Sequence, residues 1–440
     1  MRPLRVALVL LLLAARPAAA QLPLIFRAGS EWKDLSYPKL FWTPREGFTF
    51  GGHLSIGLPT RYADRSAAPH KFVTALDGQV STSGSRFVAL DAWAPALADG
   101  WRFHLTLALK HWMREPYFGL GSTASADSGD IGGRDRYYRI ERVRNYARGD
   151  VQRRIAGPVR VLVGFHWEHW FLDTLLTESA LGAELAAGGL DRIGIGTHDA
   201  SARIGLVLDT RDREAATQRG VLIEAIHTRA DADVLGDVTY SRTSVTARGF
   251  LSFGERWGLA GRVAGKSMGG TPPLGSRFMM EESDREYNGL GGPDSHRGLF
   301  WNRFVDADVL LGNVEVRYAL IPYLFRTVAV GFVDVGRVFG PGEFALTTDD
   351  LEVGGGVGLL IHFGSETAVL GLSTAVGPDG FNVLAHYRWP FSGRATRRVA
   401  PTHVGGRSRE GRPGGSPYVS VIVTPRSARA DTYRSNGIPS

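Results

Sequence analysis

Two residues of opposite charge lie in settings that could bring them together inside a protein. Arg297 and Gly298 lie in the Gly-rich stretch Gly289–Phe300 (GLGGPDSHRGLF) of a long loop, and Asp334 is the lone charge of the apolar segment Phe332–Gly336 (FVDVG). A loop of that length needs a function in a compact protein. A guanidinium removed from water needs a carboxylate to offset its desolvation. We predict a buried charge pair; the alternative is a solvated loop tip and an ordinary strand aspartate.

Motifs that carry enzyme chemistry are scarce. The sequence has no G-x-S-x-G elbow, no H-E-x-x-H, no phosphate-binding loop and no cysteine, so thiol nucleophiles and Cys-based metal sites are excluded. On a strand, His166 and Glu168 share one face and His169 points away, which is poor geometry for a metal. Adjacency of Ser295 and His296 does not form a proton relay. We predict no catalytic residue, no metal and no cofactor.

The first twenty residues have the three parts of a secretory signal peptide. A basic start, Met1–Arg5, precedes the apolar run Val6–Ala15 and the small residues Ala18–Ala20. The apolar run is too short to span a bilayer. Residues 1–20 are therefore predicted to be removed on export, and residues 21–39 to form a short periplasmic segment.

Composition favours one exported all-β domain. The 56 glycines and 10% aromatic residues are spread along the chain, and the lack of cysteine suits an oxidising periplasm. The net charge of +7 lies in residues 392–440, where nine arginines face only Glu410 and Asp431. The remainder is formally neutral, so a nucleic-acid partner is not predicted. The Arg-, Gly-, Ser- and Pro-rich tail is typical of disorder; it could contact anionic lipid headgroups or lipopolysaccharide, or remain solvated.

Strand-like alternation recurs along the chain. In Arg102–Lys110, Phe103, Leu105, Leu107 and Leu109 share one face and polar residues share the other. The segments Asn313–Tyr318 and Phe381–Phe391 alternate in the same way. A soluble sandwich would alternate too, but a second face rich in Arg, Lys, Glu and His suits a wide polar lumen better. Aromatic residues near strand ends resemble interfacial girdles.

Turn signals divide the chain into fifteen or sixteen strands, and the even number of bacterial barrels favours sixteen. The domain prediction is therefore a transmembrane antiparallel β-barrel over residues 40–391. The expected strands are 38–45, 47–59, 70–83, 84–95, 101–112, 133–155, 158–171, 197–209, 217–230, 238–252, 257–268, 306–320, 324–338, 353–363, 366–376 and 381–391.

Four motifs in one order carry a family resemblance, and a fifth supports it. The chain resembles the barrel domain of the outer-membrane assembly factors, the BamA/TamA-like bacterial surface antigens. The motifs are Asp209, Arg211 and Asp212 with Gly220 (D-x-R-D…G); His296–Leu299 (R-G-F/Y); Asn313, Glu315 and Arg317 (N-x-E-x-R); Phe332, Asp334 and Gly336 (F-x-D-x-G); and Glu115–Ser122 (F-x-G-x-G).

The resemblance implies that the Gly-rich loop folds into the lumen, where Arg297 meets Asp334 with Glu315 nearby. Asp209, Arg211 and Asp212 are equally well read as a charged periplasmic turn that ends two strands. The well-known members carry periplasmic POTRA domains before the barrel, whereas only residues 21–39 precede the barrel here, so we expect a short form. Family barrels usually end on an aromatic assembly signal, for which Phe391 is the candidate.

Three functional classes stay open. The resemblance implies an integral protein of the outer membrane of a Gram-negative-type bacterium that takes part in protein assembly, insertion or translocation. Its expected partners are outer-membrane lipids and lipopolysaccharide, with unfolded outer-membrane clients or periplasmic accessory proteins. A passive pore or structural surface antigen, with the long loop as plug, is the alternative. A barrel-borne hydrolase would require turnover that depends on one Ser or His.

Overall fold

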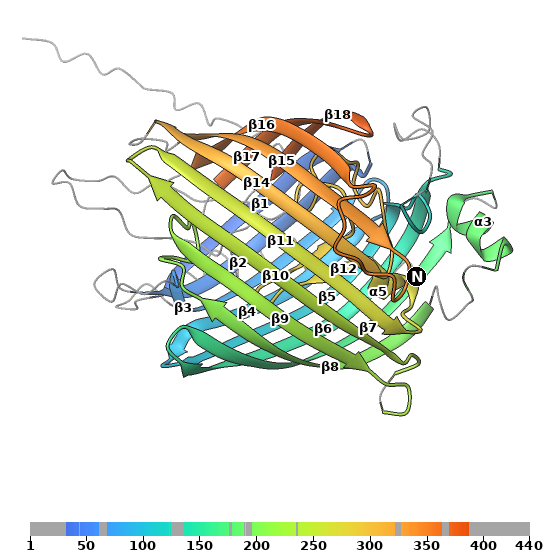
Figure 1. Ribbon diagram of the computed structural model, residues 1–440. Coiled ribbons are helices and arrows are strands. Elements are labelled where there is room, and N and C mark those ends of the chain that lie inside the picture. The colour runs from blue at the N-terminus through green and yellow to red at the C-terminus, as the bar shows by residue number, and fades with distance from the viewer. Residues whose placement is uncertain are drawn as a thin grey trace, which may run out of the picture.

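The computed structural model is a single antiparallel sheet of sixteen strands that curves into a barrel (Figure 1). This confirms the predicted sixteen-stranded barrel with a long Gly-rich loop in its lumen. The structure describes residues 32–43, 45–60, 68–122, 124, 136–175, 178–188, 190, 196–234, 236–321, 327–362 and 369–386. The wall strands are β1 (Lys33–Thr43), β2 (Gly47–Pro59), β3 (His70–Ser81), β4 (Arg86–Ala98), β5 (Trp101–Pro116), β6 (Arg139–Ala156), β7 (Val159–Thr174), β8 (Gly196–Asp209), β9 (Gly220–Ala230), β10 (Tyr240–Phe253), β11 (Trp257–Gly270), β14 (Asp308–Ile321), β15 (Thr327–Phe339), β16 (Glu352–His362), β17 (Val369–Gly377) and β18 (Gly380–His386).

Each wall strand pairs with the next one along the chain, apart from one interruption. β11 pairs directly with β14, because the intervening segment leaves the wall and forms its own two-stranded sheet, β12 (Met279–Glu281) with β13 (Glu286–Asn288). We call residues 271–307, which join β11 to β14, the lumen loop. Its position inside the wall is what builds the candidate site.

The burial pattern is inverted relative to that of a soluble protein. On β5 the side chains of Phe103, Leu105 and Leu109 are exposed, with 62% of Leu109 accessible, whereas those of His104 and Thr106 are buried. The same inversion holds on β8 and β10, where Arg203, Arg242 and Arg248 are buried and Ile204, Leu206, Val245 and Leu251 are exposed. An apolar outer band around a polar lumen is the arrangement that a bilayer requires.

The two ends of the barrel differ in the length of their connections. One end, here the long-loop end, carries the connections 117–138, 175–195 and 271–307; the other, the short-turn end, carries 99–100, 157–158 and 254–256. The lumen loop therefore enters from the long-loop end and must turn inward to reach the wall residues it contacts.

The first strand begins earlier than expected, which corrects its predicted place at 38–45 and the short N-terminal segment 21–39. β1 runs from Lys33 to Thr43, and Pro38 pairs in register with Gly52 of β2. Proline removes one ladder hydrogen bond and signals a strand boundary in a sequence, but it is tolerated on a strand with a single neighbour. Phe391, residues 1–20 and the tail 392–440 lie outside the described residues.

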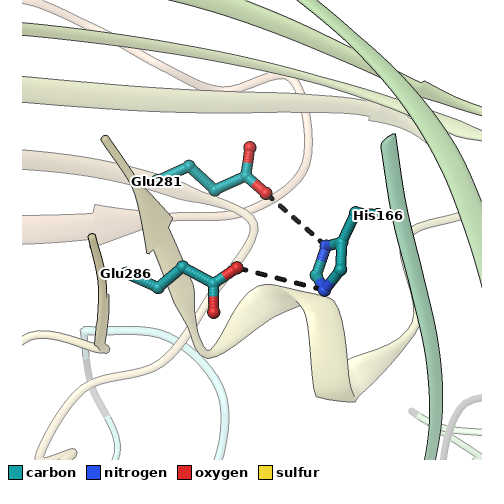
Figure 2. A group of neighbouring side chains, drawn as sticks. All are labelled: His166, Glu281 and Glu286. Carbon is teal, nitrogen blue, oxygen red and sulfur yellow. Dashed lines mark ion pairs between the residues drawn. The ribbon is translucent and has the colours of Figure 1, made fainter. Parts of the chain in front are cut away.

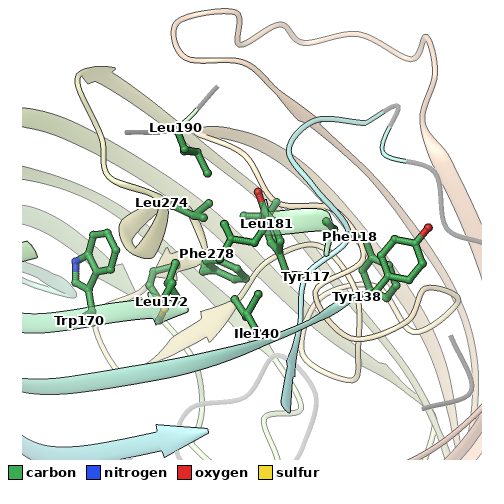
Figure 3. Packing of buried hydrophobic residues seen from close by; sticks show 13 residues of the cluster. Tyr117, Phe118, Tyr138, Ile140, Trp170, Leu172, Leu181, Leu190, Leu274 and Phe278 are labelled. Atoms are coloured by element: carbon green, nitrogen blue, oxygen red, sulfur yellow. The ribbon is translucent and has the colours of Figure 1, made fainter. Parts of the chain in front are cut away.

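An apolar cluster at the long-loop end anchors the start of the lumen loop. Leu274 of helix α5 (Leu274–Arg277) and Phe278 pack against Ile140 and Leu172 of the wall, as Figure 3 shows. Helix α3 (Ala180–Ala186), capped by Ser179, adds Leu181 to the cluster. None of the helices in the described part of the chain is long and apolar enough to cross a membrane.

Candidate functional site in the barrel lumen

The lumen loop contacts the wall through two segments of opposite charge. The loop tip, residues 295–300, carries Arg297. The acidic hairpin, residues 279–288, comprises β12, β13 and the turn between them and carries four carboxylates: Glu281, Glu282, Asp284 and Glu286. The tip docks on β14 to β18 and the hairpin on β6 to β11, so that one loop joins the two sides of the lumen.

Arg297 lies against two carboxylates of the wall and is 3% exposed. Its backbone N and its Nε donate to Oδ2 of Asp334 at 2.9 and 2.8 Å, and its Nη2 donates to Oδ1 at 2.8 Å. Nη1 donates to Oε1 of Glu315 at 2.5 Å. The guanidinium therefore uses its fork on one carboxylate and its remaining edge on another, the geometry that favours arginine over lysine.

Neighbouring wall residues hold both carboxylates in place. Asn313, the register partner of Asp334, donates from Nδ2 to Asp334 at 2.8 Å and to the carbonyl of Ser295 at 2.7 Å. Arg317 donates twice to Oε2 of Glu315, at 2.9 and 2.7 Å. The Arg297 guanidinium also lies 3.5 Å from the centre of the Phe332 ring. Every residue of the N-x-E-x-R and F-x-D motifs named above thus takes part in one network.

The loop tip also rests on the last strands of the barrel at a point without room for side chains. A Cβ added to Gly298 would lie 2.9 Å from Cα of Gly354 on β16 and 3.2 Å from Cα of Gly377 on β17. Asn382 of β18 donates to the carbonyl of Arg297 at 3.2 Å. Glycine at position 298 is therefore required by close backbone approach rather than by its dihedral freedom.

Replacing Gly298 with alanine should lift the loop tip from β16 and β17. Because the atoms in the way are backbone atoms, relief requires a shift of the tip or of the wall, at a cost of about 1–3 kcal/mol. We expect faster trypsin cleavage within residues 271–307 and a lower free energy of unfolding in guanidinium. Gly331→Ala is the matched control, since its added Cβ would meet nothing within 4 Å. Equal behaviour of the two variants would contradict the close packing.

Asn302, two residues after the tip, connects the loop to the first half of the barrel. Asn302 is buried in the left-handed region at φ 54° and donates from Nδ2 to Glu115 of β5 at 2.8 Å. On the other side, Phe300 N and Arg303 Nε donate to Asp379 at 2.8 and 2.9 Å. Glu115 opens the EPYFGLGS segment, so this motif too contributes to loop docking.

The acidic hairpin faces six buried arginines of the wall, which we call the arginine wall. Each lies within ion-pair distance of a hairpin carboxylate. Glu286 pairs with Arg144 (3.1 Å) and Arg148 (3.5 Å), Glu281 with Arg242 and with Arg203 (3.6 Å), Glu282 with Arg248 and with Arg262 (4.0 Å), and Asp284 with Arg248 (3.4 Å).

The charges of the two partners balance. Within the described part of the chain, the arginine wall also touches three wall carboxylates, Asp150, Glu168 and Glu224. These leave it a formal excess of three positive charges. The hairpin has four carboxylates and Arg285, a formal excess of three negative charges. Buried charges are tolerated only when they are paired, so hairpin and wall depend on each other. The sequence analysis missed this network, although excess arginine on alternate strand positions opposite an acidic loop segment is a visible signal.

Docking of the hairpin should weaken at acid pH. Burial alone raises the pKa of Glu281, but Arg242, Arg203 and Arg148 outweigh burial and lower this pKa from 4.5 to about 2. A carboxylate whose pKa is depressed in the folded state contributes stability that is present above pH 4.5 and lost as the pH falls towards 2. For Glu281 the contribution is about 3 kcal/mol. Digestion with an acid-active protease should stay slow at pH 4.5 and accelerate within the loop towards pH 2; pH-independent protection would contradict the assignment.

One group in the described part of the chain has the spacing of a metal site. Ligand atoms of His166, Glu281 and Glu286 all lie within 4.8 Å of one another (Figure 2). The imidazole nitrogens lie 3.8 Å from Glu281 and 3.9 Å from Glu286, and Arg144 Nη2 is 3.4 Å from His166 Nε2. Guanidinium groups already satisfy these carboxylates and would repel a divalent cation. The trio therefore belongs to the charge network of the hairpin.

The D-x-R-D turn lies at the short-turn end. Arg211 is buried and donates from Nε and Nη2 to the two oxygens of Asp209, each at 2.9 Å. Asp212 accepts from the backbone of Gln218 at 3.0 Å. Gly220, at φ 105°, starts β9 where an added Cβ would meet the Thr210 carbonyl. Arg211 shares a cavity of about 10 Å³ with Ser283 and Asp284, so the turn lies next to the tip of the acidic hairpin.

The Ser295–His296 pair has separate partners. Ser295 Oγ contacts the backbone of Gly291, accepting from N at 2.9 Å and donating to O at 3.1 Å, and His296 Nε2 lies 3.0 Å from the carbonyl of Glu352. On β7, His166 and Glu168 are both buried on the lumen face, and His169 lies on the other face. Ser295 and His296 therefore act in loop docking, and His166 and Glu168 act in the charge network.

Comparison with known proteins gives one family and several barrels of similar fold. The Omp85 superfamily domain matches residues 77–379. The crystal structure of BamA from Haemophilus ducreyi lacking POTRA domains 1–3 superposes with a TM-score of 0.52 at 11% identity, over 81% of this chain and 69% of that one. CdiB from Escherichia coli superposes with a TM-score of 0.51 at 13% identity, over 80% of this chain and 61% of that one. No curated protein matches the chain in sequence.

Proposed function

Since the chain belongs to the Omp85 superfamily, we propose that it inserts other polypeptides into the outer membrane or translocates them across it. The protein is a β-barrel of the outer membrane of Gram-negative-type bacteria, and membership of the superfamily supports outer-membrane protein assembly or translocation at the level of the family. The long-loop end is then the outer face and the short-turn end the periplasmic face.

The observation that carries the proposal is the docked lumen loop. A plugged pore would also hold a loop in its lumen, so the proposal rests on where this loop is attached. The loop tip ties together Glu315 and Asp334 and the glycines of β16 and β17. These contacts couple the lumen to the last strands of the barrel. A protein whose wall must open for a client needs such a coupling.

The last strands are suited to opening. β16 contains Gly354, Gly355, Gly356 and Gly358, and β17 and the described part of β18 span 9 and 7 residues, compared with 18 in β6. Glycine weakens a strand because it packs no side chain and loses more entropy on ordering. We place the client's entry at the seam between β1 and β18, where a client strand could pair with an exposed edge. Folding of the client is itself favourable, so no nucleotide is required.

The proposal is tested by refolding the mature chain into liposomes and timing the insertion of an unrelated outer-membrane barrel. We expect faster insertion than into empty liposomes, and loss of most of the acceleration in Arg297→Ala. Arg154→Ala is the matched control, because it removes an exposed arginine that pairs with exposed Asp99 at 2.7 Å. No acceleration, combined with a steady conductance, would favour a passive pore or surface antigen instead.

A further inference from the structure

The arginine wall has more hydrogen-bond donors than the acidic hairpin uses. Arg203 Nε and Nη2 and Arg242 Nε are buried and have no hydrogen-bond partner among the residues that the structure describes. These are side chains of the wall strands β8 and β10, and they are 2% and 1% exposed. A buried donor that lacks an acceptor costs free energy. If the wall served only to hold this hairpin, the barrel would be more stable without the unused donors. The surplus points to a second ligand for the same surface.

The contacts of the hairpin indicate the chemistry that the wall recognises. The wall binds carboxylates, as with Glu281 and Glu286, and it also binds main-chain carbonyls. Arg148 Nη2 donates to the carbonyl of Glu282 at 2.6 Å, and Arg242 Nη1 donates to the carbonyl of Ser276, in helix α5 just before the hairpin, at 3.5 Å. An acidic polypeptide offers both kinds of acceptor at these spacings, whereas a phosphate polymer offers only one.

The way in which the hairpin is joined to the wall allows another segment to replace it. β12 and β13 pair only with each other among the described strands, and the contacts with the arginine wall are made by wall side chains. Both ends of the lumen loop leave the barrel wall at the long-loop end. The hairpin can therefore withdraw towards that end without breaking a wall ladder, and withdrawal uncovers a surface with three excess positive charges.

We propose that the arginine wall is a binding site for extended acidic segments of another polypeptide, and that the acidic hairpin occupies this site as an internal substitute until such a segment replaces it. The inference rests on the proposed function, because it names the chemical class of the client segment.

The test replaces residues 279–288 by a Gly/Ser linker of equal length and records currents in planar bilayers. We expect the linker variant to select for anions and to be blocked by polyglutamate at about tenfold lower concentration than by polyglutamine. Adding Arg203→Gln and Arg242→Gln to the linker variant should abolish this preference, and adding the exposed-site change Arg154→Gln should leave it unchanged. Equal block by polyglutamate and polyglutamine would overturn the proposal. If polyphosphate blocked the current and polyglutamate did not, the ligand would not be a polypeptide.

A second measurement covers the case in which the linker variant does not fold. Heat-modifiable migration on a gel reports the folded barrel, and a synthetic peptide of residues 279–288 is added during refolding. Recovery of the folded band with this peptide, but not with its glutamine-substituted form, would support the site. If neither peptide restores folding, the double variant Glu281→Gln, Glu286→Gln is used for the same measurement of currents in planar bilayers. If polyglutamate does not block the current of this variant, the proposal is overturned. If polyglutamate did not block the current but the protein still accelerated insertion of the client, the arginine wall would not be the binding site. The proposed function would then stand.

Discussion

Replacing Arg297 with alanine should release the loop tip from the barrel wall and open the lumen loop to proteases. The change removes three side-chain donors from two carboxylates that are 0% exposed, Asp334 and Glu315, although the backbone N still reaches Asp334 and Arg317 still reaches Glu315. Removing one partner of a buried ion pair costs about 3–5 kcal/mol, mostly because the remaining charge is left uncompensated. The tip must then move so that water can reach these carboxylates.

The release of the loop can be measured by digestion of the folded protein with trypsin. We expect new cleavage after Arg277, Arg285 and Arg303 in Arg297→Ala, with fragments assigned by mass spectrometry. The free energy of unfolding in guanidinium should fall by about 3–5 kcal/mol. Arg297→Lys should give an intermediate result, because lysine keeps the charge but cannot bind one carboxylate with a fork.

Two outcomes would contradict this account of Arg297. If Arg154→Ala, which breaks an exposed pair with Asp99, destabilised the barrel as much as Arg297→Ala, burial of the pair would be irrelevant. If trypsin left the lumen loop of Arg297→Ala intact, the loop would be held by the acidic hairpin and the apolar cluster around Phe278 instead.

The sequence predicts the wall well because the wall repeats one physical rule. Each strand alternates between a lipid face and a lumen face, so Phe103 and His104 reveal the pattern of β5 without knowledge of any other strand. The rule fails for β1, where Pro38 interrupts the local signal. It also says nothing about helix α3, whose place is fixed by Ser179 at its start and by packing of Leu181 against Phe278.

The residues of the candidate site likewise fall into two groups, those that the local sequence reveals and those that it does not. Arg297, Gly298 and Asp334 are visible because an arginine in a glycine-rich loop and a lone aspartate in an apolar strand are locally unusual. The acidic hairpin is locally ordinary, since a run of Glu and Asp in a loop normally faces solvent. Its partners lie far away in the chain, as with Glu286 and Arg144, which are 142 residues apart. Pairing over such a separation follows from the curvature of the sheet around the loop, which no local pattern contains.

Replacing Glu281 with glutamine should undock the acidic hairpin. Glu281 is 2% exposed; it binds Arg242, lies 3.6 Å from Arg203 and accepts from Thr228 at 2.9 Å. A glutamine keeps the size and one acceptor but removes the charge that offsets two buried guanidiniums. We expect a loss of about 3–5 kcal/mol in the free energy of unfolding and faster tryptic cleavage after Arg285. Glu255→Gln, on an exposed turn, is the matched control.

A double-mutant cycle separates loss of the ion pair from general damage to the lumen. In the background of Arg242→Gln, the wall has already lost one of the two guanidiniums that Glu281 compensates, so Glu281→Gln should cost less than it does alone. A coupling energy well above about 0.5 kcal/mol is expected for residues in one charge network. Additive effects would mean that Glu281 and Arg242 act independently, and the hairpin would then be held by backbone contacts such as that of Arg148 with Glu282. Because Glu281 is one of the hairpin carboxylates whose pKa is lowered by the arginine wall, as is Glu286, the glutamine variant should also lose part of the acid sensitivity of the loop.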